Sequence, residues 1–553
     1  MHVLPSSPIH FFTLFRRVLL PALLLLAAGW GLGCYFETND DPAIILMLRG
    51  TTAAAPVSNL HLYFHGFSNM LAALYHTWPA LPWYGLVLYG LLYVATVLVF
   101  SVLDRLLAGR VPASWITALL VLFFLTAWLE HGLWFNYVRV PVLLAGAGVL
   151  FAAQRPQSRA ALVVGVVAFG ISWLIRPSIA VLGLLLVVPG ACWLSGRRAA
   201  PVLAAAVLWA AVGAGVLNVV RSPQAAALRT VDVPKANLND YQLLRAVPRT
   251  ATDSLGIRAV RAWMMADSTL LNENFFRRAT RLEPAYFLRH TAPLKLQVLL
   301  NLVLRDYFPL LLLQLVLWGW VGGASDAPGR RWFWLVQLGY MGLVLALGVV
   351  LKLPPRIGLP VFDFWVLGNL LYVLRVGGQA PDRRLATILV VLAIVAVPYA
   401  YKTLHRRSIL QVERQHNQQL RQQLTAALPP AVLLVTDVLP ATYKSASPFR
   451  NPDVVPAKML MLTGWTTADP SQVSWRQQLT GTRNFGAGMR QLAQQGSAVQ
   501  WLLTPRVAAI LNQQLHLLPA GSQMRFAPAP KFRAATQPAD TIWYYQPVLE
   551  TRK

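Results

Sequence analysis

The chain has 553 residues, of which 56% are hydrophobic and only 12% are charged, and its formal net charge is +27. Because the charged residues cluster between long uncharged stretches, the composition excludes an ordinary soluble protein and is typical of a polytopic α-helical membrane protein. The positive charge comes without a basic helix, a zinc-ligand spacing or a stacking-aromatic motif, so we expect membrane lipids and no nucleic acid as partners.

The first predicted membrane span covers residues 18–35. A helix of this length crosses a bilayer, because it rises about 1.5 Å per residue and the hydrocarbon core is about 30 Å thick. Arg16 and Arg17 precede it and place the N-terminus in the cytoplasm by the positive-inside rule. The sequence predicts ten further spans, at 82–102, 112–129, 137–153, 160–175, 178–195, 200–220, 294–320, 331–351, 357–376 and 385–401.

Alternate loops between these eleven spans are basic. Arginines cluster in five loops that this topology places inside, at 105–110, 155–159, 197–198, 330–331 and 383–384. The same topology places four regions outside, namely the loop 37–81, the loop 130–137, the segment 221–293 and everything after Lys402. The predicted organisation is a transmembrane domain over 1–401, an exit helix or linker over 402–428, and an extracytoplasmic domain over 429–553.

The first outer loop carries three acids, Glu37, Asp40 and Asp41. Farther along it, apolar stretches with interleaved histidines and aromatics predict an interfacial helix lying on the membrane. Carboxylates at a membrane surface stay hydrated and can face a ligand in the headgroup layer. The alternative is a solvated loop, in which Asp41 caps the next helix and Pro42 occupies its first turn.

The C-terminal region predicts a small α/β domain. Buried strands are expected at 431–437, 458–463 and 499–504, alternating with helices at 485–495 and 506–515. A glycine-rich phosphate loop, a nucleophile elbow and metal-ligand spacing are all missing from this stretch of sequence. We therefore expect this domain to be structural or to bind an acceptor.

Further charged residues stand at the predicted outer ends of spans. Glu130 and His131 end the third span, and together with Asp41 they form a set that suits a divalent cation or polarises a hydroxyl. The alternative for Glu130 and His131 is an ordinary helix end at the interface.

Four cations also lie at outer ends, where positive-inside proteins are poor in them. Arginine suits the bidentate binding of a phosphate or pyrophosphate. The alternative for these residues is snorkelling to lipid headgroups. The four are Arg139, Arg176, Lys352 and Arg356.

This pattern resembles the GT-C superfamily of polytopic membrane glycosyltransferases over about residues 16–401. The likeness lies in an acidic pair in the first outer loop, a second acid in the next one, an interfacial helix and an α/β tail. More narrowly, Asn39-Asp40-Asp41 with the later Pro82-Trp83-Tyr84 is similar to uncharacterised bacterial members of that neighbourhood.

The resemblance implies a reaction and a place in the cell. The enzyme would move a sugar from a polyprenyl-phosphate-linked donor to an envelope glycan, lipid or protein acceptor, with inversion. It would be a multi-pass protein of the bacterial inner membrane, with a cytoplasmic N-terminus and a periplasmic C-terminal domain.

The resemblance also implies roles for particular residues. Asp40 or Asp41 would be the catalytic carboxylate and Glu130 the second acid, while Glu37 departs from the pattern as a third acid and leaves the choice of base open. A divalent cation, Mg²⁺ or Mn²⁺, is possible, because some members use a metal and others do not; its ligands would be Asp41, Glu130 and His131. Donor-phosphate binding falls, on chemical grounds, to Arg176, Lys352, Arg356 and Arg139.

Three other functions suit the same residues. A flippase or transporter of lipid-linked sugars would use the cations without turnover, but it favours charges at the bilayer midplane. An O-antigen polymerase or ligase would build its cavity around the segment 221–293 and its paired arginines. A non-enzymatic envelope scaffold would act through the tail domain, and loss of the acids would be silent.

Overall fold

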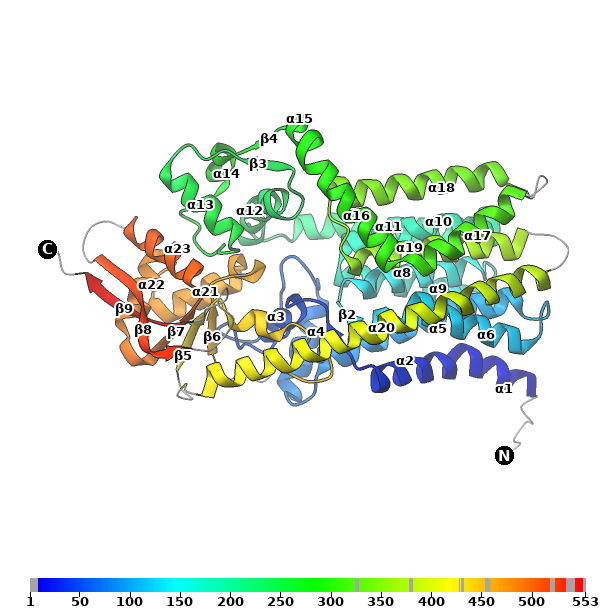
Figure 1. The fold of residues 1–553 in the computed structure, drawn as a ribbon, viewed down its shortest axis with the longest axis horizontal. Coiled ribbons are helices and arrows are strands. Elements are labelled where there is room, and N and C mark those ends of the chain that lie inside the picture. The colour runs from blue at the N-terminus through cyan, green and yellow to red at the C-terminus, as the bar shows by residue number, and fades with distance from the viewer. Residues whose placement is uncertain are drawn as a thin grey trace.

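The computed structural model describes residues 8–323, 328–376, 381–426, 428, 432–452, 458–517, 523–533 and 543–550. Figure 1 shows an elongated molecule, with a helix bundle at one end and a mixed domain containing the C-terminal sheet at the other. We call the end of the bundle next to that sheet the domain end, where α2 (Leu20–Gly31) ends and α5 (Trp83–Leu107) begins. The opposite end is the far end.

The bundle is built from apolar helices. Its other helices are α1 (Pro8–Leu14), α6 (Ala113–Phe123), α7 (Leu129–Leu133), α8 (Arg139–Ala153), α9 (Arg159–Ile175), α10 (Pro177–Ser195), α11 (Ala200–Val219), α16 (Ala292–Asp306), α17 (Phe308–Gly323), α18 (Arg330–Leu345), α19 (Pro355–Val376) and α20 (Pro381–Ala426). Wider π-helical turns continue several of them, at Phe15–Leu19, Phe124–Trp128 and Ala346–Val350.

Among the described residues, seven helices are long and apolar enough to cross a membrane, or eight if the bent pair formed by α16 and α17 crosses as one. A helix occupies each of the eleven predicted stretches. The number of helices that can cross a membrane is smaller than eleven for physical reasons. Helices α8 and α9 are short, α10 and α11 follow each other through Gly196 with φ +58°, and the chain bends by 85° between α16 and α17. The structure therefore has the helix content of a multi-pass membrane protein.

Several of the predicted basic loops come together at the far end. Arg16 and Arg17 both pair with the buried Asp104 at 2.6 Å, which joins the start of the first span to the end of α5. In the same region, Arg110 donates to the Leu374 carbonyl at 2.8 Å and Arg155 to the Ser101 carbonyl at 3.2 Å. One end of the bundle is thus basic, as the alternating loops predicted.

The C-terminal domain contains a five-stranded sheet in the order β6-β5-β7-β9-β8. Strands β5 (Leu433–Thr436), β6 (Lys458–Met461) and β7 (Val499–Leu503) are parallel and confirm the three predicted strands. The predicted helices are also present, as α22 (Phe485–Gln494) and α23 (Pro505–His516), and α21 (Pro470–Thr480) lies beside α22. The hairpin of β8 (Gln523–Arg533) and β9 (Trp543–Glu550) was not predicted and extends the sheet antiparallel.

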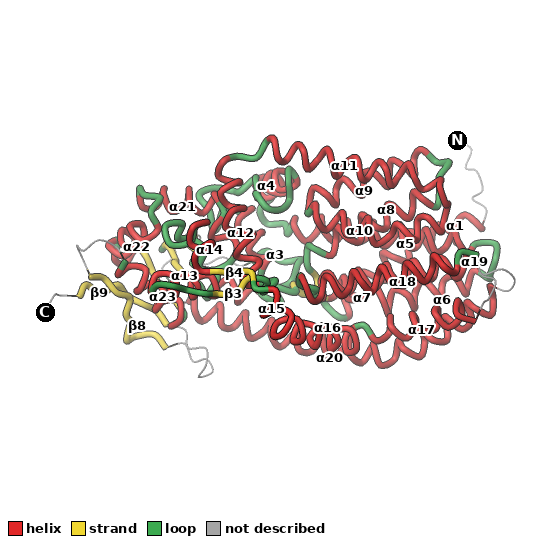
Figure 2. Tube along the Cα trace, turned by 90° about the horizontal axis from the view of Figure 1, so that it is seen from above, coloured by secondary structure: helices red, strands yellow, loops and turns green. Residues whose placement is uncertain are grey.

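The segment 221–293 does not form a unit apart from the tail. It folds into α12 (Pro223–Asn239), β3 (Leu244–Ala246), α13 (Ala251–Arg261), α14 (Glu273–Ala279), β4 (Thr280–Leu282) and α15 (Pro284–Tyr286). Buried side chains of this segment, such as Val260 and Phe275, share one apolar cluster with Trp501 and Leu511 of the tail. Figures 1 and 2 show α13 and α14 beside the sheet domain.

Helix α20 links the two parts of the molecule. It runs for 46 residues from the bundle to the sheet domain, so the predicted last span and exit helix are one continuous helix (Figure 1). The first outer loop forms α3 (Asp40–Leu48) and α4 (Phe67–Thr77). Residues 44–48 of α3 are 0–2% exposed, so this helix lies inside the protein, and only α4 keeps exposed apolar side chains such as Met70.

Candidate functional site

Two outer loops are joined by a short parallel sheet of β1 (Tyr35–Phe36) and β2 (Trp134–Phe135). Tyr35 lies opposite Trp134, and the backbone N–H of Glu37 donates to the Phe135 carbonyl at 2.7 Å. Short apolar strands of this kind pair because their backbone groups are buried and need hydrogen bonds. The pairing places the first-loop acids beside the start of α8.

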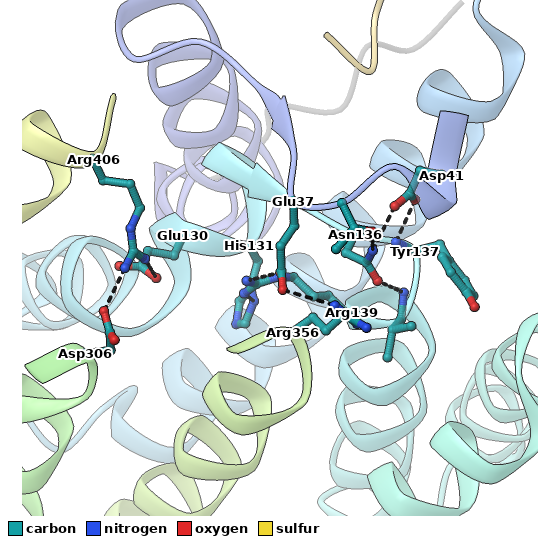
Figure 3. A network of polar contacts seen from close by, with 12 residues as sticks. Glu37, Asp41, Glu130, His131, Asn136, Tyr137, Arg139, Asp306, Arg356 and Arg406 are labelled. Atoms are coloured by element: carbon teal, nitrogen blue, oxygen red, sulfur yellow. Dashed lines mark hydrogen bonds and ion pairs between the residues drawn. The ribbon is translucent and has the colours of Figure 1, made fainter. Parts of the chain in front are cut away.

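Glu37 belongs to a buried chain of ion pairs and hydrogen bonds (Figure 3). Arg139 Nη2 donates to Glu37 Oε2 at 2.8 Å, and Arg139 Nη1 donates to His131 Nδ1 at 3.1 Å. Since His131 Nδ1 accepts, its proton sits on Nε2, which donates to Asp363 Oδ2 at 2.7 Å. All four side chains are buried, so this chain fixes the position of Glu37 and does not face a ligand.

Asp41 is fully buried and accepts three hydrogen bonds. Oδ1 accepts from the Tyr84 hydroxyl and the Tyr137 N–H, both at 2.9 Å, and Oδ2 accepts from Asn136 Nδ2 at 2.8 Å. Burial raises the pKa of Asp41 to about 8, although the hydrogen bonds from Tyr137 and Tyr84 act in the opposite direction. These contacts tie the first turn of α3 to the loop before α8.

Asp40 is the first-loop acid that keeps an open side, with its side chain 30% exposed. It begins α3, and its Oδ2 accepts a hydrogen bond from the Thr38 hydroxyl at 3.1 Å. Arg356 Nη2 lies 4.0 Å from this oxygen, and Arg356 Nη1 lies 3.6 Å from Glu37 Oε1. The structure thus brings together two of the predicted site residues, Asp40 and Arg356, from the first outer loop and the first turn of α19.

Arg176 lies between α9 and α10 and packs on two aromatic rings. Its Nη1 donates to the Tyr137 hydroxyl at 2.6 Å, and its guanidinium lies 4.6 Å from the Tyr63 ring centre. Burial lowers the pKa of Arg176, but Tyr137, Tyr63 and Asp40 more than offset it, and the net shift is upward. The Nε atom is buried without a hydrogen-bond partner among the described residues. Tyr137 therefore links Arg176 to the first-loop acids, since its hydroxyl contacts Arg176 and its N–H donates to Asp41.

Glu130 is in a different group, held by two cations of α20. Its Oε1 lies 3.2 Å from Lys402 Nζ and its Oε2 lies 2.8 Å from Arg406 Nη1. Both cations also pair with Asp306, at 3.1 and 2.7 Å. Figure 3 shows this group apart from Asp41, with Glu37 and His131 between them. The prediction that Glu130 joins the first-loop acids at one centre does not match this placement.

Lys352 also lies away from the first-loop acids. Its Nζ pairs with Asp240 Oδ1 at 3.0 Å, and the lysine side chain is 49% exposed. Asp240 follows α12, so this pair joins the bundle to the segment 221–293. Within the described ranges, no ion pair connects Lys352 to Glu37 or Asp40.

The predicted metal ligands Asp41, Glu130 and His131 do not come together. Across the part of the chain that the structure describes, no group of three His, Cys, Asp or Glu side chains is arranged to hold a metal ion. Each of the three already faces other partners: hydrogen-bond donors at Asp41, two cations at Glu130, and Arg139 with Asp363 at His131. As placed, these residues do not fit a shared cation.

Sequence reasoning missed most of the residues that hold the acids in place. Asp363 carried a signal, since it is the single acid in the apolar run 357–376 and intramembrane acids are rarely without a partner. Lys402 and Arg406 carried a weaker one, because their spacing of four puts them on one helix face. Tyr84 belongs to the Pro82-Trp83-Tyr84 motif of the resemblance, but nothing there indicated its contact with Asp41. Nothing in the sequence marked the remaining contacts, which come from Asn136 and Tyr137.

Comparisons with protein-family models, curated proteins and solved structures give no match for this chain.

Proposed function

We propose that this protein is a membrane glycosyltransferase that moves a sugar from a polyprenyl-phosphate-linked donor to a hydroxyl of an envelope glycan, lipid or protein. The observation that carries the proposal is the pair of Asp40 and Arg356, a partly exposed carboxylate 4.0 Å from a partly exposed guanidinium at the domain end of the bundle. Such a pair supplies a proton acceptor and an anion contact side by side.

Asp40 is the base in this proposal. Glu37 is 3% exposed and bound to Arg139, and Asp41 is 0% exposed with three hydrogen-bond donors on its oxygens. Neither can approach an acceptor hydroxyl without breaking those contacts. The Asp40 side chain is 30% exposed and needs no such change. The proposal therefore assigns the base to Asp40.

The reaction is a single displacement at the anomeric carbon. The acceptor oxygen forms a bond to that carbon while its proton passes to Asp40, and the bond from carbon to the phosphate oxygen breaks. The electron pair leaves with the polyprenyl phosphate, whose growing charge is stabilised by Arg356 and by Arg176 nearby. Attack opposite to the leaving group inverts the anomeric configuration.

Other predicted residues act by positioning in this scheme. Arg139 holds Glu37, and Glu37 in turn pairs with Arg356, so the orientation of the phosphate contact depends on a buried chain. Glu130 anchors α20 to the end of the third span instead of serving as a second catalytic acid. Because the metal ligands do not converge, no step is routed through a metal.

The proposal includes an orientation in the membrane. The far end collects basic loops, and such loops stay in the cytoplasm. The domain end, with Asp40 and Arg356, then faces the extracytoplasmic side, where lipid-linked sugars are donors for envelope glycans. In a bacterial inner membrane, the sheet domain would stand in the periplasm.

The test is a donor screen with purified protein in proteoliposomes. The wild type is given a set of polyprenyl-phosphate-linked and polyprenyl-diphosphate-linked sugars with a crude envelope acceptor, and released polyprenyl phosphate or diphosphate is measured. We expect one donor class to be consumed and Asp40→Asn to slow its consumption by about 10²–10⁴-fold, as for loss of a general base.

A matched control is Glu273→Gln, which removes an exposed acid of α14 whose one ion pair among the described residues is with Arg277 of the same helix. It is expected to retain wild-type turnover. Consumption of the donor by Asp40→Asn at the wild-type rate would refute the role of Asp40, and a wild type that consumes no donor would refute the reaction class.

A further inference from the structure

A cavity of about 300 Å³ lies at the domain end, separate from the Asp40 group. Its walls are the chain just after the first span at Gly33 and Cys34, the exit part of α20, and the segment 442–452 that follows β5. Its volume is at the lower end of the roughly 300–1,000 Å³ found for small-ligand sites. The lining includes four cations: Arg414, Arg421, Lys444 and Arg450.

The charge in this cavity is not balanced within the described part of the chain. Glu413 is the carboxylate recorded beside it, and it pairs with Lys444 at 2.8 Å and accepts a hydrogen bond from the Ser445 hydroxyl. Arg414 and Arg450 both line this cavity. A cluster of cations in a partly enclosed space gains from an anion, since charges are poorly screened there.

Two of the arginines are held in place before any ligand arrives. Arg414 donates to the carbonyls of Ser445, at 3.0 Å, and Cys34, and its guanidinium lies 3.8 Å from the Tyr35 ring centre. Arg421 donates to the Thr442 carbonyl at 3.1 Å. These contacts use only part of the five N–H donors of each guanidinium. The remaining donors form planar forks that match the oxygens of a phosphate.

Two features of its surroundings point to the membrane–water interface as the level of this cavity. The first candidate span ends at Gly31, immediately before it. Asn451, which lines the cavity, donates to the carbonyls of residues 79–81 just before α5. There Trp78, which is 54% exposed, packs against Trp83 with ring centres 5.8 Å apart. Tryptophans at helix ends mark the headgroup region.

We propose that this cavity binds the phosphate group of an anionic membrane lipid. The bound headgroup would neutralise the arginines of α20 and of the segment 442–452, and so hold the sheet domain against the end of the first span. The site does not depend on the proposed transferase reaction, because none of its four cations contacts Asp40 or Arg356 in the described structure.

The test uses full-length protein in a neutral detergent. Its melting temperature is titrated with phosphatidylglycerol in mixed micelles, with zwitterionic phosphatidylcholine, and with inorganic phosphate. We expect saturable stabilisation by phosphatidylglycerol. In the double variant Arg421→Gln/Arg450→Gln, the apparent affinity should fall about tenfold or more, since each cation near an anionic surface contributes to lipid binding.

Two further variants separate binding from folding. Arg450→Gln alone removes an exposed side chain and should fold normally while weakening binding severalfold. Arg197→Gln/Arg198→Gln removes two arginines at the far end and should leave the phosphatidylglycerol effect unchanged.

The comparison of probes identifies the source of the phosphate. Stabilisation by phosphatidylglycerol but not by inorganic phosphate supports a lipid headgroup, and equal stabilisation by inorganic phosphate supports the same site with a soluble phosphate as ligand. The proposal is overturned if phosphatidylglycerol does not stabilise the wild type. It is also overturned if the double variant keeps the wild-type affinity, or if the far-end control loses it equally.

Discussion

Two groups of acids lie at the domain end of the bundle, and they differ in how fully their oxygens are occupied. Glu130 is 2% exposed and sits between Lys402 and Arg406, each of which also holds Asp306. Among the described residues, Asp40 has one ion pair, with Arg356 4.0 Å away, and its side chain is 30% exposed. The Glu130 group joins three helices, whereas the Asp40 side chain is partly open to solvent.

Two carboxylates at similar helix ends can therefore differ in how available they are for proton transfer. Both Asp40 and Glu130 lie in loops that the predicted topology places outside. A carboxylate enclosed by two cations contributes to stability, because removing it leaves charges without partners in a partly buried place. Replacing a carboxylate that has one distant cation lowers the stability less, and such a carboxylate is available for proton transfer. The two groups should therefore respond differently to the same substitution.

After Asp40→Asn, the largest expected effect is on activity at Arg356. Arg356→Gln should slow donor consumption about 10²–10³-fold, as for the loss of one charge-stabilising donor. Stability should change little, since Glu37 keeps its pair with Arg139. The measurement is the proteoliposome assay, with Arg277→Gln as an exposed control that retains activity. A rate within twofold of wild type would remove Arg356 from the leaving-group role.

The opposite pattern is expected at Glu130. Glu130→Gln should destabilise the protein by about 2–3 kcal/mol, less than the roughly 3–5 kcal/mol for breaking a buried pair, because Asp306 continues to hold both cations. The folded fraction should keep its turnover within about threefold. Denaturation followed by tryptophan fluorescence measures the loss of stability. The transfer assay measures turnover. Lost turnover with unchanged stability would return Glu130 to the catalytic group.

A smaller effect is expected from the pH dependence of Asp41. Because the folded-state pKa is raised to about 8, above the ordinary value of 3.8, the folded protein holds a proton that the unfolded chain releases over this interval. Stability should therefore fall as pH rises from about 4 through 8. Asp41→Asn should flatten that part of the profile. Melting temperatures across the interval check this, and an unchanged profile in the variant would show that Asp41 is not the source.

The smallest effect is expected at Lys352. Its pair with Asp240 is half-exposed, and exposed ion pairs contribute about 0–1 kcal/mol. Lys352→Gln should change stability by less than about 0.5 kcal/mol and leave donor consumption within twofold of wild type. A large loss of activity would place Lys352 at the donor phosphate and contradict its separation from Asp40.

Local pattern predicted the elements of this fold well. Apolar runs became helices, because a run of apolar side chains and the hydrogen-bonding needs of its backbone are both properties of neighbouring residues. The same holds for the three parallel strands of the tail and for the helix that continues past residue 401. The hairpin of β8 and β9 was missed, because its second strand is recognised by what it pairs with and not by its own alternation.

The sequence by itself determined the membrane class, the helical stretches, and the acids and cations at the helix ends. Only the tertiary structure decided which acid meets which cation. Asp40 and Arg356 lie far apart in the chain, and their contact depends on the pairing of β1 with β2 and on where α19 begins. Side chains become partners through backbone placement over long separations, and no local pattern of residues encodes that placement.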